Sequence, residues 1–156
     1  MAERAVRNLS MLARIGALTW EERRLIAEAA LLIGVLRMAL RVAGVRRVQR
    51  MLSAALPASA SSDGPRAEGR RRAVAISRLV DTAARHTVTN TCLHRSLALW
   101  WLLGRRGLTS EFRMGTRRLH GQFEAHAWVQ CGGATVNDGG DSGYAPLAWP
   151  PVEHDA

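Results

Sequence analysis

The sequence predicts an α+β protein, with helices first and a small antiparallel sheet after them. Apolar residues recur at helical spacing as far as Leu103, whereas beyond Gly107 apolar and polar residues alternate as in half-buried strands. The pair Gly132-Gly133 separates two alternating segments and predicts a hairpin turn. With 156 residues and a hydrophobic fraction of 47%, the chain suits one compact domain with a core of its own.

Residues 1–52 form a predicted helical section. Thr19 and Glu22 have the spacing of a capping box, so we expect a helix from about Trp20 to Val42. Its apolar side is wider than the stripe of a typical amphipathic helix, and arginines flank it. A helix of this kind can lie on a membrane surface, but burial against its own domain or a partner protein is the favoured interpretation.

The rest of the chain divides into a linker and a second section. Gly44 is expected to end the first helix, with another short helix over residues 45–52. Residues 53–69 are rich in Ala, Ser, Pro and Gly, which predicts a flexible linker. Residues 70–156 make up the second section, and its first helix is expected over residues 70–85.

The N-terminal region carries no pattern that predicts export or a membrane span. Charged residues interrupt any signal-peptide core at Glu3, Arg4, Arg7 and Arg14. The longest charge-free apolar stretch nearby, residues 29–36, is far shorter than the ~20 residues that a spanning helix needs. We therefore expect a cytoplasmic protein.

The charge of the chain is strongly positive, at +9, and all 22 basic residues are arginine. The arginines are scattered and aromatic residues are few, so no nucleic-acid-binding motif emerges. A solvated surface with some preference for acidic partners is the better interpretation. The two cysteines, Cys92 and Cys131, lack metal-ligand spacing, and we expect no metal and no cofactor. A structural disulfide between them is possible but unsupported, since no secretion signal accompanies them.

Three residues in the second section suggest nucleophilic chemistry. Cys92 begins the most apolar helix of the chain, His126 lies in the predicted strand 123–131, and Asp138 follows the return strand 134–137. A helix N-terminus favours a thiolate, and a nearby imidazole can pair with it and then give a proton to a departing amine. The aspartate would hold the imidazole in the useful tautomer.

Each residue also has a simpler explanation. Cys92 could be a small buried hydrophobe, His126 a hydrogen-bonded core histidine and Asp138 a turn residue. Their order and their elements together favour catalysis. The hairpin leaves the orienting residue open: a strict two-residue turn places Asn137 on the side of His126, whereas a longer turn or a bulge places Asp138 there. We expect Asp138.

Other polar residues near these elements are weaker candidates. Oxyanion stabilisation could use the backbone N–H of Cys92 with Asn90 or Gln122. His94 points away from Cys92 on the same helix, at about 200°. The remaining expectations are a loop position for His120, a packed position for Cys131 and a fallback acid in Asp141.

Two strings carry a family resemblance. Residues 91–99, with the pattern Cys-Leu-x-Arg-Ser-Leu-Ala-Leu, and residues 125–129, Ala-His-Ala-Trp-Val, resemble the B2 proteins of lasso-peptide biosynthesis. These are stand-alone leader peptidases, similar to the C-terminal domain of the microcin J25 processing protein. The resemblance covers roughly residues 70–150 and extends more loosely to the helical section 20–52.

The resemblance implies a transglutaminase-like, papain-like cysteine protease fold with a Cys/His/Asp triad at Cys92, His126 and Asp138. It implies removal of the leader from a ribosomally made precursor peptide. A small leader-binding protein of the B1 type would deliver the substrate, and a lasso cyclase would act next. No leader-recognition domain is evident in this chain, which fits a separate partner. The alternatives are a non-proteolytic acyltransferase or transglutaminase on the same fold, and an inactive peptide-binding scaffold.

Overall fold

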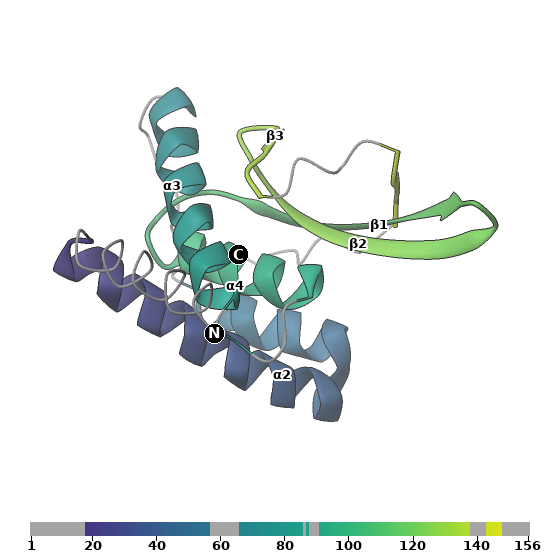
Figure 1. Cartoon of the computed structure of the whole chain (residues 1–156), viewed down its shortest axis with the longest axis horizontal. Helices are drawn as coiled ribbons and strands as arrows, with labels where there is room; N and C mark the ends of the chain where they lie inside the picture. The colour runs from purple at the N-terminus through teal and green to yellow at the C-terminus, as the bar shows by residue number, and fades with distance from the viewer. Residues whose placement is uncertain (1–17, 57–65, 86, 88–90, 138–142, 148–156) are drawn as a thin grey trace, which may run out of the picture.

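A computed structural model describes residues 18–56, 66–85, 87, 91–137 and 143–147. Within these residues the chain forms helices and then an antiparallel sheet of strand order β3-β2-β1-β4 (Figure 1). The α+β prediction is confirmed. The elements are α2 (Trp20–Ala54), α3 (Arg66–Arg85), α4 (Cys92–Gly104), β1 (Glu111–Leu119), β2 (Gln122–Cys131), β3 (Ala134–Thr135) and β4 (Ala145–Pro146).

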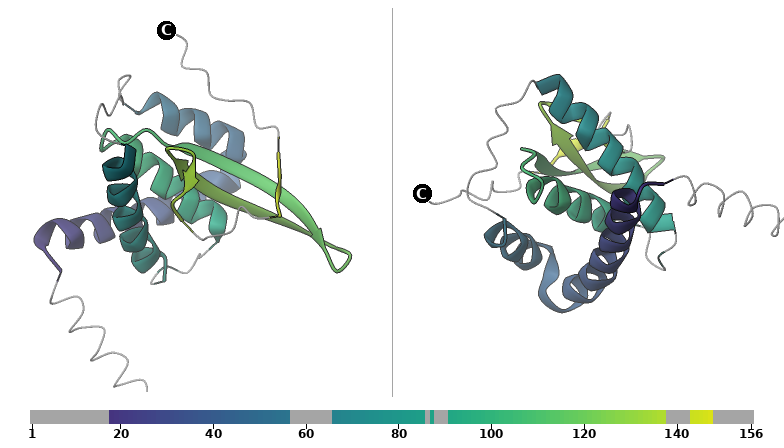
Figure 2. Two further views of the ribbon diagram at one scale, coloured as in Figure 1. Left: turned by 90° about the horizontal axis from the view of Figure 1, so that it is seen from above. Right: turned by 90° about the vertical axis from the view of Figure 1, so that its left-hand side faces the viewer.

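Helix α4 is the centre of the structure. It packs on β1 and β2 on one side and on α2 and α3 on the other (Figures 1 and 2). Its buried run of Leu97, Leu99, Leu102 and Leu103 explains this place, because a helix that is apolar on most sides must be surrounded. The β1–β2 hairpin is long enough to extend beyond the helices (Figure 2, left).

Helix α2 begins and bends as the sequence predicts. Both hydrogen bonds of the capping box are present between Thr19 and Glu22. Gly44 has φ 72° and ψ 166°, so the helical geometry breaks there and two helical stretches meet at a kink. Leu25, Ala29 and their neighbours Ile33 and Leu36 turn inward to the core. No described helix combines the length and the apolar character needed to cross a membrane.

The helices extend farther into the predicted linker than expected. α2 continues to Ala54, where the buried hydroxyl of Ser53 donates to the carbonyl of Gln49 (3.0 Å). α3 begins at Arg66 instead of at residue 70. The middle of the predicted linker, residues 57–65, lies outside the described residues.

The sheet follows the predicted alternation. Ala127, Val129 and Cys131 face the helices, whereas His126 and Trp128 face the opposite side. Gly132-Gly133 forms a two-residue turn in which both residues have positive φ, 60° and 81°, as the right-handed twist of a hairpin requires. The short strand β4 was not predicted, and it pairs with β1 on the far edge.

Candidate active site

The N-terminus of α4 holds the candidate nucleophile. Thr91 is the N-cap, with extended backbone, and its side chain accepts a hydrogen bond from the N–H of His94 (3.4 Å). Cys92 is therefore the first helical residue. It is half-buried and packs against the edge of the core. Its backbone N–H is one of the donors of the first turn that have no partner within the helix.

Ser96 connects α4 to the strand that carries His126. Its hydroxyl is fully buried and donates to the carbonyl oxygen of Ala127, at 2.8 Å. Residues four apart share one face of a helix, so Cys92 lies one turn from Ser96 on the face turned toward β2. Because Ala127 follows His126 directly, this hydrogen bond joins α4 to the strand that carries His126, although the imidazole lies on the face of the sheet opposite the helices.

Asn137 completes the connection. Its side-chain oxygen accepts from the N–H of Val129 (2.7 Å), and its side-chain N–H group donates to the hydroxyl of Ser96 (2.9 Å). The residue is buried. Both ends of the amide are thus used to join the end of β3, the start of α4 and β2. Both Asn137 and Asp138 stay predictions for the residue that orients the imidazole.

The hairpin is regular, which contradicts the longer turn or bulge that would place Asp138 beside His126. Gln130 pairs with Thr135, and the N–H of Val136 donates to Val129 (3.0 Å), in the register of a strict two-residue turn. Backbone pairing ends there, because the N–H of Val129 donates to the side-chain oxygen of Asn137 and not to a backbone carbonyl of the opposite strand. The register therefore does not decide the facing of Asp138, which lies outside the described residues.

His126 lies in an aromatic layer on the outer face of the sheet. Its ring stacks on Trp128 at 6.1 Å between centroids and lies 5.1 Å from the ring of Tyr144. Gly115 on β1 pairs directly with His126. A Cβ at Gly115 would come within 2.8 Å of the indole of Trp128, so only glycine leaves room for that ring.

Tyr144 is held against the histidine by a charged pair. Arg117 and Glu124 form a hydrogen-bonded ion pair at 2.7 Å. The guanidinium also lies over the Tyr144 ring at 4.4 Å, and the phenol donates to the carboxylate of Glu124 at 3.4 Å. The hydrogen bond to Arg117 lowers the pKa of Glu124, and the same bond raises the pKa of Arg117. The pair stays ionised at neutral pH.

The second cysteine has a different environment. Cys131 is buried in the core, as predicted, and both cysteines are free thiols. Burial raises the pKa of Cys131, and the charge of Arg70 offsets only part of this effect. Cys131 is therefore a packing residue of low nucleophilicity.

The other candidates are not brought to this site by the described structure. Gln122 is exposed at the tip of the hairpin, ~13 Å along β2 from His126, too far to donate to an oxyanion formed beside that ring. His94 contacts Thr91, and burial together with the charge of Arg37 lowers its pKa. His120 occupies the β1–β2 turn. Asn90 and Asp141 lie outside the described residues.

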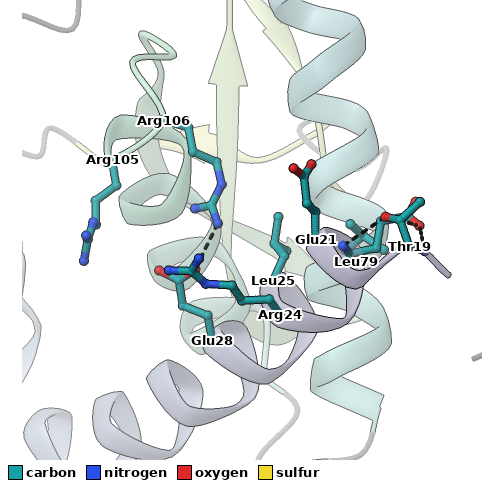
Figure 3. Close-up of a pocket in the computed structure, with 9 residues that line it drawn as sticks. Thr19, Glu21, Arg24, Leu25, Glu28, Leu79, Arg105 and Arg106 are labelled. Carbon is teal, nitrogen blue, oxygen red and sulfur yellow. Dashed lines mark hydrogen bonds and ion pairs between the residues drawn. The ribbon is translucent and has the colours of Figure 1, made fainter.

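A surface pocket lies at the other end of α4, ~20 Å from Cys92 along the helix axis. It has a volume of about 650 Å³, and Arg106 forms an ion pair with Glu28 at 2.9 Å in its wall (Figure 3). Arg24 and Arg105 also line it. Within the described residues no cluster of His, Cys, Asp and Glu could hold a metal ion.

Comparison with known families identifies the class of protein. The chain matches the transglutaminase-like superfamily over residues 33–148, most of its length. It belongs to that family, whose enzymes are usually cysteine peptidases or acyl transferases. The match starts inside α2 and includes Cys92, His126 and Asp138. No curated protein and no solved structure matches the chain.

Two residues of the site were missed by sequence reasoning. Ser96 could have been found from the sequence, because a serine four residues after a candidate cysteine shares its helical face. No pattern in the sequence predicts Tyr144 as a site residue, because its contact with His126 depends on the path of the chain from β3 to β4.

Proposed function

We propose that this protein is a cysteine peptidase that removes the leader from a ribosomally made lasso-peptide precursor. The observation that carries the proposal is the Ser96–Ala127 hydrogen bond, which joins the helix that begins with Cys92 to the strand that carries His126. Membership of the transglutaminase-like superfamily supports thiol-based acyl transfer. The two sequence strings, residues 91–99 and 125–129, support the leader-peptidase assignment.

The reaction proceeds in two steps. The thiolate of Cys92 attacks the carbonyl at the leader–core junction, and the tetrahedral intermediate collapses to a thioester as the C–N bond breaks. His126 gives its proton to the departing amine of the core peptide. Water then attacks the thioester, His126 takes a proton from it, and the leader leaves as a carboxylic acid. The backbone N–H of Cys92 is suited to stabilise the oxyanion, and Asp138 is the proposed orienting acid.

The proposed reaction depends on two further proteins. A small leader-binding protein presents the precursor, and a lasso cyclase consumes the freed amine. Seven arginines and a single acid between residues 23 and 50 would favour an acidic surface on one of these partners.

The test is a cleavage assay on the cognate precursor with the leader-binding protein present, read by mass spectrometry. The wild-type chain is expected to release leader and core. Cys92→Ala is expected to abolish release, whereas the matched variant Cys131→Ala retains it, because Cys131 only packs the core. Undiminished cleavage by Cys92→Ala would rule out this mechanism.

The same assay separates hydrolysis from transfer. Hydrolysis leaves a leader acid whose mass includes one water, whereas an acyltransferase leaves a leader joined to an amine. An inactive scaffold is tested by alkylation with iodoacetamide. Cys92 is expected to react faster than Cys131, whose pKa is raised by burial. Equal, slow alkylation of both cysteines would favour the scaffold.

A further inference from the structure

Helix α2 is apolar on two opposite sides, and the described part of the chain buries only one of them. The inner side is buried through Leu25, Ala29, Ile33 and Leu36. Figure 1 shows α2 along one edge of the molecule, with α3, α4 and the sheet all on its inner side. We name the exposed apolar side the outer stripe. It consists of Trp20, Leu31, Val35, Met38 and Val42, which are between 55% and 84% exposed.

The outer stripe has the geometry of a helix-packing seam. Leu31, Val35, Met38 and Val42 follow one another at intervals of four, three and four residues. This spacing keeps them in line on one face and matches the a and d positions at which two helices interlock. The exposed area is several hundred Å² on an order-of-magnitude estimate, the size at which apolar patches mark interaction sites.

Gly34 beside the stripe points to a helix as the occupant. It is exposed in the middle of α2, and a Cβ placed on it would meet nothing within 4 Å. A mid-helix glycine costs about 1 kcal/mol relative to alanine. Among the residues that the structure describes, no close contact explains it. The missing side chain leaves a notch at which the backbone of a second helix can approach closely. Such a notch would not strengthen contact with a lipid surface.

Charge decides between a second copy and another protein. Arg24 and Arg41 are exposed near the two ends of the stripe. Glu28, the one acid between residues 23 and 50, is already paired with Arg106. Two copies packed through this face would bring arginines together. An occupant with Asp or Glu beside its apolar seam would meet them favourably.

We propose that the outer stripe docks a helix of a separate protein, apolar along its centre and acidic along its flanks. Resting on the proposed function, we identify that protein as the one that delivers the leader. The docking face lies on the side of α2 turned away from α4. Binding there leaves the N-terminus of α4 and the His126 face of the sheet open to the peptide (Figure 1).

The experiment measures binding of the purified, fluorescently labelled leader-binding protein to the full chain, with precursor cleavage measured in parallel. The double variant Leu31→Glu/Met38→Glu is expected to weaken binding by about tenfold or more, because it places acids in the seam. Phe123→Glu is the matched control. It makes the same kind of change at an apolar side chain that is 74% exposed on the hairpin, and binding is expected to stay at the wild-type value.

Each other outcome overturns the inference. Unchanged binding by the double variant would place the partner elsewhere. A wild-type dimer in light scattering that the double variant abolishes would make the stripe a self-association face. Sedimentation of the wild type, but not the variant, with vesicles of phosphatidylcholine and phosphatidylglycerol would make it a lipid face. A wild-type chain that cleaves the precursor without binding the partner would end the docking inference alone. Failure of both binding and cleavage would end the proposed function as well.

Discussion

Gly115 on β1 leaves room for Trp128, the large aromatic residue near His126 on β2. The position pairs with His126 in the β1–β2 ladder, and the indole of Trp128 lies over it. An added Cβ would lie 2.8 Å from the indole and 2.9 Å from the carbonyl oxygen of Ala145. Neither atom can yield easily, because one belongs to a buried ring and the other to the backbone of β4.

Gly115→Ala is therefore expected to destabilise the protein by about 1–3 kcal/mol and to lower cleavage, because the layer around His126 must shift. Thermal unfolding and the cleavage assay measure the two effects. Gly34→Ala is the control: its Cβ meets nothing, and a stability gain of about 0.5–1 kcal/mol is expected in the isolated chain. A Gly115→Ala protein as stable and active as wild type would contradict the packing of Trp128 over this residue.

His94 gives the stability a pH dependence. Burial and the charge of Arg37 lower its pKa in the folded state below the ordinary histidine value of about 6.5, which an unfolded chain approaches. The folded state therefore disfavours the protonated ring. As the pH falls below the unfolded pKa, the unfolded chain binds more protons and stability decreases, levelling off below the folded pKa.

Replacing His94 with Gln removes this titration. The decrease in melting temperature between pH 7.5 and pH 5.5 is expected to be smaller in His94→Gln than in the wild-type chain. Differential scanning fluorimetry on both proteins in the same buffers makes the comparison. Equal decreases would show that His94 is not held in its neutral form by the fold.

At the scale of elements, one buried hydroxyl joins α4, β2 and the end of β3. Ser96→Ala removes two hydrogen bonds, one to the carbonyl of Ala127 and one from the side-chain amide of Asn137. A loss of about 1–3 kcal/mol is expected. Because the same bonds join the helix of Cys92 to the strand of His126, kcat should also fall at temperatures where the variant is fully folded.

Ser53→Ala is the matched control for this prediction. Ser53 is buried too, but its hydroxyl donates only to Gln49 within its own helix. Ser53→Ala should lower the free energy of unfolding by less than Ser96→Ala does, and it should leave kcat unchanged. If Ser96→Ala lowers kcat no more than Ser53→Ala does, the connection between α4 and β2 does not position the nucleophile.

The same elements show what a sequence can predict. The capping box at Thr19, the break at Gly44 and the Gly132-Gly133 turn depend on residues close together in the chain, and the structure confirms each. The role of Asn137 could not be predicted, because its partner Ser96 is 41 residues away and the contact exists only after α4 and the sheet pack. The predicted register requires that β2 and the return strand stay paired as far as residue 137, whereas the side chain of Asn137 ends the pairing.

Across the whole molecule, hydrophobic patterning predicted α2 but not its environment. A helix that is apolar on most sides is expected to be buried, and the sequence alone does not say by what. In the described residues one side meets α3 and α4, and the outer stripe remains exposed. The family match begins at residue 33, within this helix, so the second part of α2 belongs to the transglutaminase-like domain.

The net charge of +9 predicts how that surface responds to salt. Raising NaCl from 0.1 to 1 M shortens the screening length from ~10 Å to ~3 Å, so attraction between α2 arginines and an acidic partner should weaken. The association rate is expected to fall more than the dissociation rate rises, because steering acts before contact. Stopped-flow fluorescence with the labelled leader-binding protein measures both. Arg24→Gln/Arg41→Gln should bind more slowly at 0.1 M and depend less on salt. A wild-type association rate that is flat across this range would contradict an acidic partner and leave the apolar seam as the sole basis of docking.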